Sequence, residues 1–368
     1  MIRALVADDS ALMRRHLTQL LESAGGFTVQ TARNGLEVLE ALRTFDPHVI
    51  TLDVNMPEMD GITCLSRIMS EDPRPVVMVS SLTEQGAETT LQALSLGAVD
   101  FVQKPGGTIS LSIDRIHREL LMKIRSAATT RVRRSTGLRG RLAAQRRRAT
   151  PEPPPRVSFA RGGPTGLVLV GVSTGGPGVL EEILPRLPKD FPWPVLVAQH
   201  MPSSFTGVFA RRLNDLCAVS VVEVARQMPI EPGTVYIAKG DADLVVTRRG
   251  TGYSATPLPQ SNEHIWHPSV ARMVESALAH LPANRLIAVQ LTGMGDDGAE
   301  AMARVRAGGG MTIAQDEDTS IVFGMPHELI KRGGASLVLP SDAIAEQLVG
   351  WLRAPEAGAR AGERRRGP

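Results

Sequence analysis

Short apolar runs alternate with stretches of helical spacing through the first third of the chain. The runs, most of them rich in β-branched residues, predict strands at Ile2–Ala7, Val29–Thr31, Val49–Leu52, Val76–Val79 and Val99–Val102. Apolar positions three to four apart predict helices at Leu12–Ser23, Leu36–Thr44, Gly61–Ser70, Glu84–Leu96 and Leu111–Ile124. Continuous apolar strands between helices are typical of a parallel sheet covered on both faces. We therefore expect a five-stranded parallel α/β domain over residues 1–124.

The alternation stops after residue 124 and resumes at Leu167. Residues 125–164 are rich in Arg and Pro, so we expect a linker there. Further strands are predicted at Leu167–Val170, Val195–Ala198, Val219–Val224, Thr234–Ala238, Leu286–Leu291, Met311–Ala314 and Ser336–Leu339. Helices are predicted at Pro177–Leu184, Phe205–Leu216, Ser269–His280, Gly298–Ala307 and Asp342–Leu352. This pattern indicates a second, doubly wound and mostly parallel α/β domain over 165–352, and we expect a disordered tail over 353–368.

Length and composition agree with two domains and a cytoplasmic address. At 368 residues the chain is too long for one ordinary core. Cys64 and Cys217 lie far apart in sequence, which disfavours a disulfide framework or a thiolate zinc site and favours a reducing compartment. No apolar run reaches the roughly 18 residues that a membrane helix needs. The first strand begins at Ile2, which leaves no room for a signal peptide, so we expect no membrane insertion.

The net charge of +3 is unevenly distributed, because residues 125–150 hold nine arginines and no acid. Subtracting them, 3 − 9 leaves about −6 for the rest of the chain. Such a run could bind nucleic acid or an acidic lipid surface. It has no interleaved aromatic residue, so we expect an interdomain tether and no nucleic-acid partner; DNA binding lost on deleting this run would revise that.

Acidic residues follow the ends of two predicted strands of the first domain. Asp8 and Asp9 follow the first strand and Asp53 follows the third, while Ser80 and Lys104 follow the fourth and fifth. Strand ends converge at the carboxyl edge of an open parallel sheet, so these side chains can share one cleft. Close carboxylates need a cation, and oxygen ligands favour Mg²⁺.

This ordered set resembles that of the response-regulator receiver domain, which has a flavodoxin-like fold, over essentially all of residues 1–124. The resemblance implies that Asp53 is the phosphoacceptor and takes its phosphoryl group from a partner histidine kinase. It implies Mg²⁺ bound by Asp8, Asp9, Asp53 and the backbone carbonyl of Asn55. It also implies a phosphate switch formed by Ser80, Phe101 and Lys104.

In the second domain, the strand from Leu167 leads into Gly171-Val172-Ser173-Thr174-Gly175-Gly176-Pro177 and then a predicted helix. Three interpretations are open for this loop. It is a structural glycine-rich turn, a nucleotide-binding loop weakened by Ser173 at the middle glycine of G-x-G-x-x-G, or a nucleophile turn that fits G-x-S-x-G.

A nucleophilic serine needs a base and a group that orients the base. His200 follows the strand at Val195–Ala198, and Asp296 and Asp297 follow the strand at Leu286–Leu291. Alone, the histidine could be a surface residue and either acid a helix cap. Their joint placement at three strand ends favours acyl transfer by Ser173, with His200 as the base and an aspartate to orient it. The order Ser, His, Asp excludes an α/β-hydrolase, which runs Ser, Asp, His.

The flanking sequences resemble the catalytic domain of the chemotaxis protein-glutamate methylesterases of the CheB type. The matching segments are Gly171–Pro177, Gln199–Pro202, Leu291–Gly298, Ala314–Glu317 and Val322–Pro326. The resemblance implies a Ser173, His200 and Asp297 triad, with an oxyanion hole near Thr174 and Met294. It implies hydrolysis of glutamate γ-methyl esters on methyl-accepting chemoreceptors, with no cofactor for the esterase, and a receiver that covers the site until it is phosphorylated. Related members also deamidate glutamine.

The sequence departs from this family around the substrate cleft. The family's Y-I-A-P-G-x-x-H is replaced by Tyr236-Ile237-Ala238-Lys239-Gly240-Asp241-Ala242-Asp243. In the family's H-x-P-S-V-D, Trp266 stands at the histidine and Ala271 at the aspartate. A phosphoacceptor or scaffold protein without receptor esterase activity is therefore an alternative. His264 and His267 are three apart, but no cluster of carboxylates or cysteines accompanies them, which disfavours a metal site.

Overall fold

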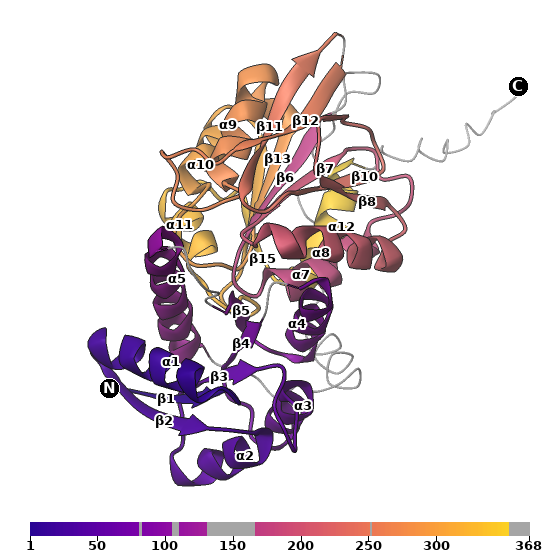
Figure 1. Cartoon of the computed structure of the whole chain (residues 1–368). Helices are drawn as coiled ribbons and strands as arrows, with labels where there is room; N and C mark the ends of the chain where they lie inside the picture. Colours follow the sequence, from indigo (N-terminus) through magenta and orange to yellow (C-terminus); the bar gives the residue numbers. More distant parts are fainter. Residues whose placement is uncertain (81–82, 105–109, 131–165, 251, 353–368) are drawn as a thin grey trace, which may run out of the picture.

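A five-stranded parallel sheet in the order β2-β1-β3-β4-β5 forms the first domain (Figure 1). The computed structural model describes residues 1–80, 83–104, 110–130, 166–250 and 252–352. Within them the strands are β1 Ile2–Ala7, β2 Phe27–Ala32, β3 Val49–Asp53, β4 Val76–Ser80 and β5 Asp100–Gln103. The central strand β3 is buried throughout, as expected for a sheet covered on both faces. The predicted flavodoxin-like fold is confirmed.

Five helices accompany these strands: α1 Ala11–Ser23, α2 Gly35–Thr44, α3 Gly61–Glu71, α4 Glu84–Leu96 and α5 Ser110–Thr129. The first four begin at side-chain caps, since Ser10, Asn34, Asp60 and Thr83 each accept a hydrogen bond from a backbone N–H three residues on. Helix α5 ends at Thr129, so the first five residues that we assigned to the linker, 125–129, are helical instead. The rest of the linker from 131 and the tail from 353 lie outside the described residues.

The second domain is built on a seven-stranded sheet in the order β15-β14-β13-β6-β7-β10-β8, and every pairing in it is parallel. Its strands are β6 Leu167–Val172, β7 Val195–Gln199, β8 Ser220–Val224, β10 Thr234–Ala238, β13 Leu286–Gln290, β14 Met311–Gln315 and β15 Leu337–Leu339. The predicted strands match these within two residues at either end, and the doubly wound, mostly parallel class is confirmed.

A small antiparallel sheet, in the order β11-β12-β9, was not predicted. It consists of β9 Met228–Pro229, β11 Ala242–Arg249 and β12 Gly252–Pro259. One face of β11, with Leu244 and Val246 buried, packs against α9 (Val270–His280). Pro257 and Pro259 at one end of the register and polar residues in β12 weaken the alternating pattern that would mark these strands in the sequence.

Helices cover the second sheet: α7 Gly176–Ile183, α8 Ser203–Leu216, α9 Val270–His280, α10 Ala299–Ala307, α11 Met325–Lys331 and α12 Ser341–Leu352, with short 3₁₀ turns η1 Leu184–Arg186 and η2 Ala283–Arg285. Helix α11 was also not predicted, because its seven residues span too few turns for a clear period.

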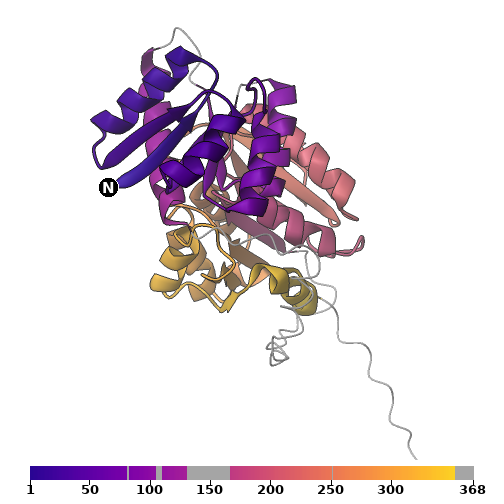
Figure 2. The same ribbon diagram turned by 90° about the horizontal axis from the view of Figure 1, so that it is seen from below.

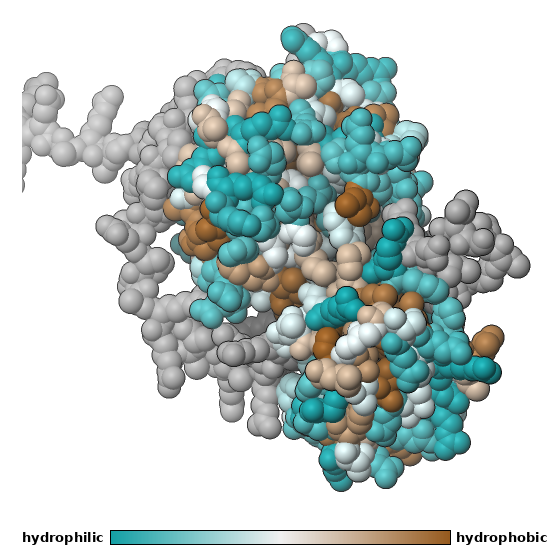
Figure 3. Space-filling model, turned by 90° about the vertical axis from the view of Figure 1, so that its left-hand side faces the viewer, coloured by the Kyte–Doolittle hydropathy of each residue, from teal (hydrophilic) through white to brown (hydrophobic). Residues whose placement is uncertain are grey.

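None of the helices in the described ranges is long and apolar enough to cross a bilayer. On the face in Figure 3, hydrophilic residues predominate and hydrophobic ones lie in small scattered groups.

The two domains pack directly on one another. Helix α4 of the first domain contacts α7 and α8 of the second (Figures 1 and 2). The ring centroids of Phe101 and Phe205 lie 4.3 Å apart across this contact, and both side chains are buried. At the rim, Arg212 bonds both Glu181 in its own domain and Ser95 of α4. One apolar core therefore continues from the first sheet into the second.

Candidate active site

Ser173 lies at the carboxyl end of β6, in the turn that leads to α7. Its N–H donates to the Thr292 carbonyl at 3.0 Å, and its own carbonyl accepts from the Gly176 N–H and from Gln199 Nε2, both at 2.9 Å. Gly175 caps the helix with φ +77°, a conformation that favours glycine. Hydrogen bonds thus fix the turn on both sides of Ser173.

Met294, the second proposed oxyanion donor, follows β13 in a loop pressed against Ser173. A Cβ on Gly293 would lie 2.7 Å from the Ser173 Cβ, so only glycine lets the two backbones approach this closely. Gly295, on the other side of Met294, has φ +83°. Met294 is therefore next in the chain to a glycine that packs against Ser173.

His200 and Asp297 form a buried pair at the ends of β7 and β13. His200 Nε2 lies 2.9 Å from Asp297 Oδ2, and each side chain is 7% exposed. Asp297 also accepts from the backbone N–H groups of Val270 and Ala271, at 2.7 and 2.9 Å, and from the Ser269 hydroxyl at 3.2 Å. Because these N–H groups open helix α9, the carboxylate caps that helix as well as holding the imidazole.

The charge of Asp297 determines which imidazole nitrogen carries the proton. Burial raises the pKa of this carboxyl, but the hydrogen bond and charge of His200 and the two backbone N–H groups outweigh burial, so the pKa lies below its usual value. An ionised carboxylate only accepts hydrogen bonds, so His200 Nε2 must be the donor. In the neutral ring this leaves a free lone pair on Nδ1.

His200 Nδ1 is buried and makes no hydrogen bond with any described residue. The predicted bond from the Ser173 hydroxyl is therefore not formed in this conformation. The two residues are nonetheless neighbours at one sheet edge. Val172 and Gln199 are register partners in β6 and β7, and the His200 N–H donates to the Val172 carbonyl at 3.1 Å. Nδ1 is the nitrogen available to act as the base.

Thr174, predicted as an oxyanion residue, is engaged by the other domain. Its hydroxyl donates to Asp100 Oδ2 of β5 at 2.5 Å, and both residues are buried. Lys123 of α5 holds Asp100 in place with Nζ 3.2 Å from Oδ1, and the same ammonium donates to the Phe101 carbonyl at 2.8 Å. Asp100 and Lys123 were not anticipated. The sequence did hold a signal, because Asp100 is an acid inside the apolar strand predicted at Val99–Val102. A buried carboxylate needs a partner.

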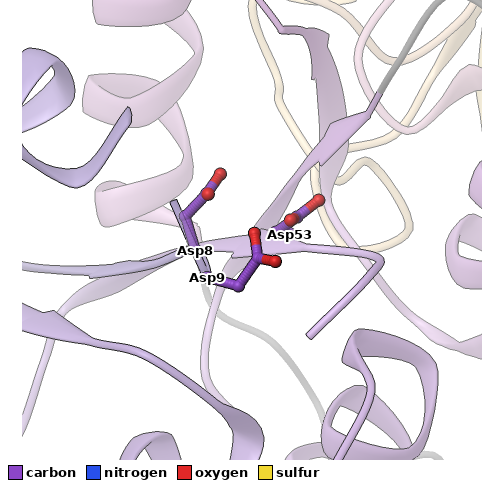
Figure 4. A group of neighbouring side chains, drawn as sticks. All are labelled: Asp8, Asp9 and Asp53. Carbon is purple, nitrogen blue, oxygen red and sulfur yellow. The ribbon is translucent and has the colours of Figure 1, made fainter. Parts of the chain in front are cut away.

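The acidic cleft of the first domain brings Asp8, Asp9 and Asp53 together at the ends of β1 and β3 (Figure 4). Ligand oxygens of the three carboxylates lie within 4.8 Å of one another. Lys104 follows β5, and its Nζ lies 2.7 Å from Asp53 Oδ2 and 3.0 Å from Asp8 Oδ2. Burial raises the pKa of Asp53, and hydrogen bonding and charge from Lys104 oppose that rise.

The donor set of this cleft fits Mg²⁺. Three carboxylates and one ammonium leave about two negative charges unbalanced, which a divalent cation would neutralise, and every donor is a hard oxygen. A cleft of about 300 Å³ opens beside Asp53, and Asn55, Ser80 and Lys104 line it. Phe101 lies away from this cleft, in contact with Phe205 of the second domain.

The departures from the family pattern lie around the His200–Asp297 pair. The Trp266 ring stacks on the His200 ring with centroids 5.4 Å apart and planes 9° from parallel. His267 Nδ1 lies 2.8 Å from Oδ1 of Asp243, which is fully buried and occupies the position of the family's histidine. His267 thus has an acidic partner, and no metal cluster includes it among the residues that the structure describes.

Comparison with known families agrees with this architecture. The family of response regulator receiver domains matches residues 4–113, and the CheB methylesterase family matches residues 168–348. Together they define a response regulator fused to a hydrolase of carboxylic esters.

The relatives identify the family more closely. A protein-glutamate methylesterase/protein-glutamine glutaminase of Rhodospirillum rubrum is 62% identical over 96% of this chain and 96% of its own. One from Rhodopseudomonas palustris is 54% identical over 97% of this chain and 100% of its own, and one from Vibrio cholerae 45% identical over 90% and 91%. The chain belongs to the CheB-type protein-glutamate methylesterase/protein-glutamine glutaminase family.

Proposed function

We propose that this chain is a phosphorylation-activated methylesterase that hydrolyses glutamate γ-methyl esters on chemoreceptors, and that it also deamidates glutamine there. The observation that carries the proposal is the buried His200–Asp297 pair, which leaves Nδ1 unprotonated beside the turn that holds Ser173. A lone serine hydroxyl is a weak nucleophile, and such a base is what it needs.

In the proposed reaction, His200 Nδ1 removes the Ser173 proton as the serine oxygen attacks the ester carbonyl. Asp297 holds the ring and stabilises its positive charge. The imidazolium then protonates the departing methoxide oxygen, which leaves as methanol, and an acyl-enzyme remains. Water, deprotonated by the same nitrogen, attacks the acyl carbonyl, and the imidazolium returns the proton to the Ser173 oxygen as glutamate leaves. With glutamine the leaving group is ammonia. The Ser173 hydroxyl must first rotate or shift toward Nδ1, since the two groups are not bonded in this conformation.

Donors from the Thr174 and Met294 region would stabilise the oxyanion. One such donor contributes about 3 kcal/mol in serine hydrolases. The hydrogen bond from the Thr174 hydroxyl to Asp100 competes with this role, because it ties the residue to a carboxylate of the receiver at 2.5 Å. We infer that the receiver inhibits the esterase partly through this contact.

Phosphorylation would relieve the inhibition. Asp53 would accept a phosphoryl group from a histidine kinase, and Asp8, Asp9, Asp53 and the Asn55 carbonyl would hold Mg²⁺, which neutralises phosphoryl charge when bound. Lys104 would leave the carboxylates for the phosphoryl group, and the Ser80 hydroxyl would donate to it. Phe101 follows Asp100 directly, so repacking it would pull Asp100 from Thr174. We place this chemistry in the cytoplasm.

The test is methanol release from methylated chemoreceptor, with and without a small phosphodonor. Wild type should release methanol and do so faster with the phosphodonor, while Ser173→Ala should be inert under both conditions. If wild type and Ser173→Ala are equally inert on several receptors, the esterase proposal fails.

A further inference from the structure

One short segment, Trp266–Ala271, contacts both His200 and Asp297 of the proposed relay. Its C-terminal end supplies the Val270 and Ala271 N–H groups and the Ser269 hydroxyl that Asp297 accepts. Its first residue, Trp266, stacks on His200. The position of the imidazole relative to its carboxylate therefore depends on this segment as a unit.

The segment is anchored to the small antiparallel sheet through Asp243 of β11. That carboxylate accepts from His267 Nδ1 at 2.8 Å, from the Ser269 N–H at 2.8 Å and from Arg272 at 2.8 Å, and it is 0% exposed. The Ser261 N–H also donates to this carboxylate, at 3.2 Å. The donors from His267 and Ser269 fix the turn on both sides of Pro268. The chain that directly follows Trp266 is consequently fixed to β11.

Trp266 also lies against the proposed oxyanion loop. A Cβ on Gly295 would be 3.5 Å from the indole Nε1, so the tryptophan spans from the His200 ring to the residue after Met294. Its flat face thus limits rotation of His200 while its edge limits movement of the loop.

We propose that Trp266 is a positioning residue for acyl transfer, which keeps His200 Nε2 on Asp297 and Nδ1 toward Ser173. This rests on the proposed function. The same indole face favours the imidazolium that forms when His200 takes the serine proton, because an aromatic face attracts a cation within about 6 Å. An interaction that strengthens in the transition state changes kcat more than KM.

Turnover of phosphodonor-treated enzyme tests this with graded variants. Trp266→Leu should lower kcat about tenfold with KM changed less than about twofold, and Trp266→Phe should recover most of that loss.

Ile265→Ala, at the adjacent and 80% exposed position, should match wild type. Trp351→Leu, in the core of α12, should lower Tm without lowering kcat. Equal kcat for Trp266→Leu and wild type, or equal loss for the Phe and Leu variants, would overturn the proposal.

NMR of the histidine side chains gives a readout that needs neither turnover nor a folded Leu variant. The carbon-bound protons of His200, assigned by their absence in His200→Gln, should show the upfield ring-current shift of a stacked indole, and Nε2 should carry the proton. An unshifted His200, or exchange between the two tautomers, would overturn the proposal. If wild type releases no methanol, the proposed function fails, and these spectra still decide whether Trp266 positions the ring.

Discussion

The hydroxyl of Thr174 donates to the carboxylate of Asp100 at 2.5 Å, which ties the esterase turn to the last strand of the receiver sheet. Both groups are buried, so little water competes for the bond. The phosphate cleft and the esterase site are thus joined through β5, which carries Asp100 and Phe101 and ends next to Lys104.

Weakening this bond should raise esterase activity in the absence of a phosphodonor. Asp100→Asn replaces a charge-assisted hydrogen bond with a neutral one, a difference of about 1 kcal/mol, so basal methanol release should rise about fivefold. Lys123 would keep Glu119 at 3.0 Å and the Phe101 carbonyl, so the receiver should still fold. Asp190→Asn, at an exposed position, is the control. Basal activity at or below the wild-type level would argue against the contact as an inhibitory one.

Substitution at the phosphoacceptor should separate basal from stimulated activity. Asp53→Asn removes the nucleophilic carboxylate, which ends β3 and is separated by β4 from the strand that carries Asp100, so basal methanol release should stay near wild type. Stimulation by a phosphodonor should be lost. Residual stimulation of wild-type size would show that another residue accepts the phosphoryl group.

Chelation of divalent cations should also abolish stimulation by the phosphodonor while leaving basal esterase activity. With EDTA, phosphodonor stimulation should disappear and basal esterase activity should persist, since the proposed Mg²⁺ ligands all belong to the receiver and the relay uses none. Added Mg²⁺ should restore stimulation. Loss of basal activity with EDTA, reversed by Mg²⁺, would instead point to a cation in the esterase reaction.

The orienting carboxylate makes a sharper prediction. Asp297→Asn can donate to His200 Nε2 and so favours the wrong tautomer, and kcat should fall about a thousandfold or more. Glu300→Gln, exposed on the following helix, serves as the control. A loss below about tenfold would mean that Asp297 serves mainly as the cap of α9.

The contribution of the buried Asp243 carboxylate to the Tm should depend on pH in the acid range. Burial raises the pKa of Asp243, but hydrogen bonds from His267, Ser269 and Arg272 outweigh it and hold the pKa below its usual value. A carboxyl with a lowered pKa stabilises the fold above its unfolded-state pKa of about 4, and this stabilisation is lost as pH falls through the folded-state pKa. The Tm of full-length Asp243→Asn should therefore be well below wild type at pH 7, and the gap should narrow as the pH falls below about 4. A gap that stays constant over this range would contradict the assignment.

Much of this arrangement could be predicted from the sequence, because parallel strands bring their carboxyl ends to one edge. That rule placed Asp8, Asp53 and Lys104 in one cleft and His200 beside Asp297. The partners set by tertiary packing could not be predicted. Asp100 meets Thr174 across a domain interface, and Trp266 reaches His200 by a turn anchored 23 positions earlier, at Asp243. The hairpin of β11 and β12 was missed because its register includes prolines and polar residues.

Covalent labelling of Ser173 reports whether His200 activates this serine. A small fluorophosphonate reacts with a serine only when a base activates it, and mass spectrometry locates the adduct. We expect an adduct on Ser173 that forms faster after phosphodonor treatment and is lost in His200→Gln. Labelling of another serine, or labelling of Ser173 at the same rate in His200→Gln, would contradict it.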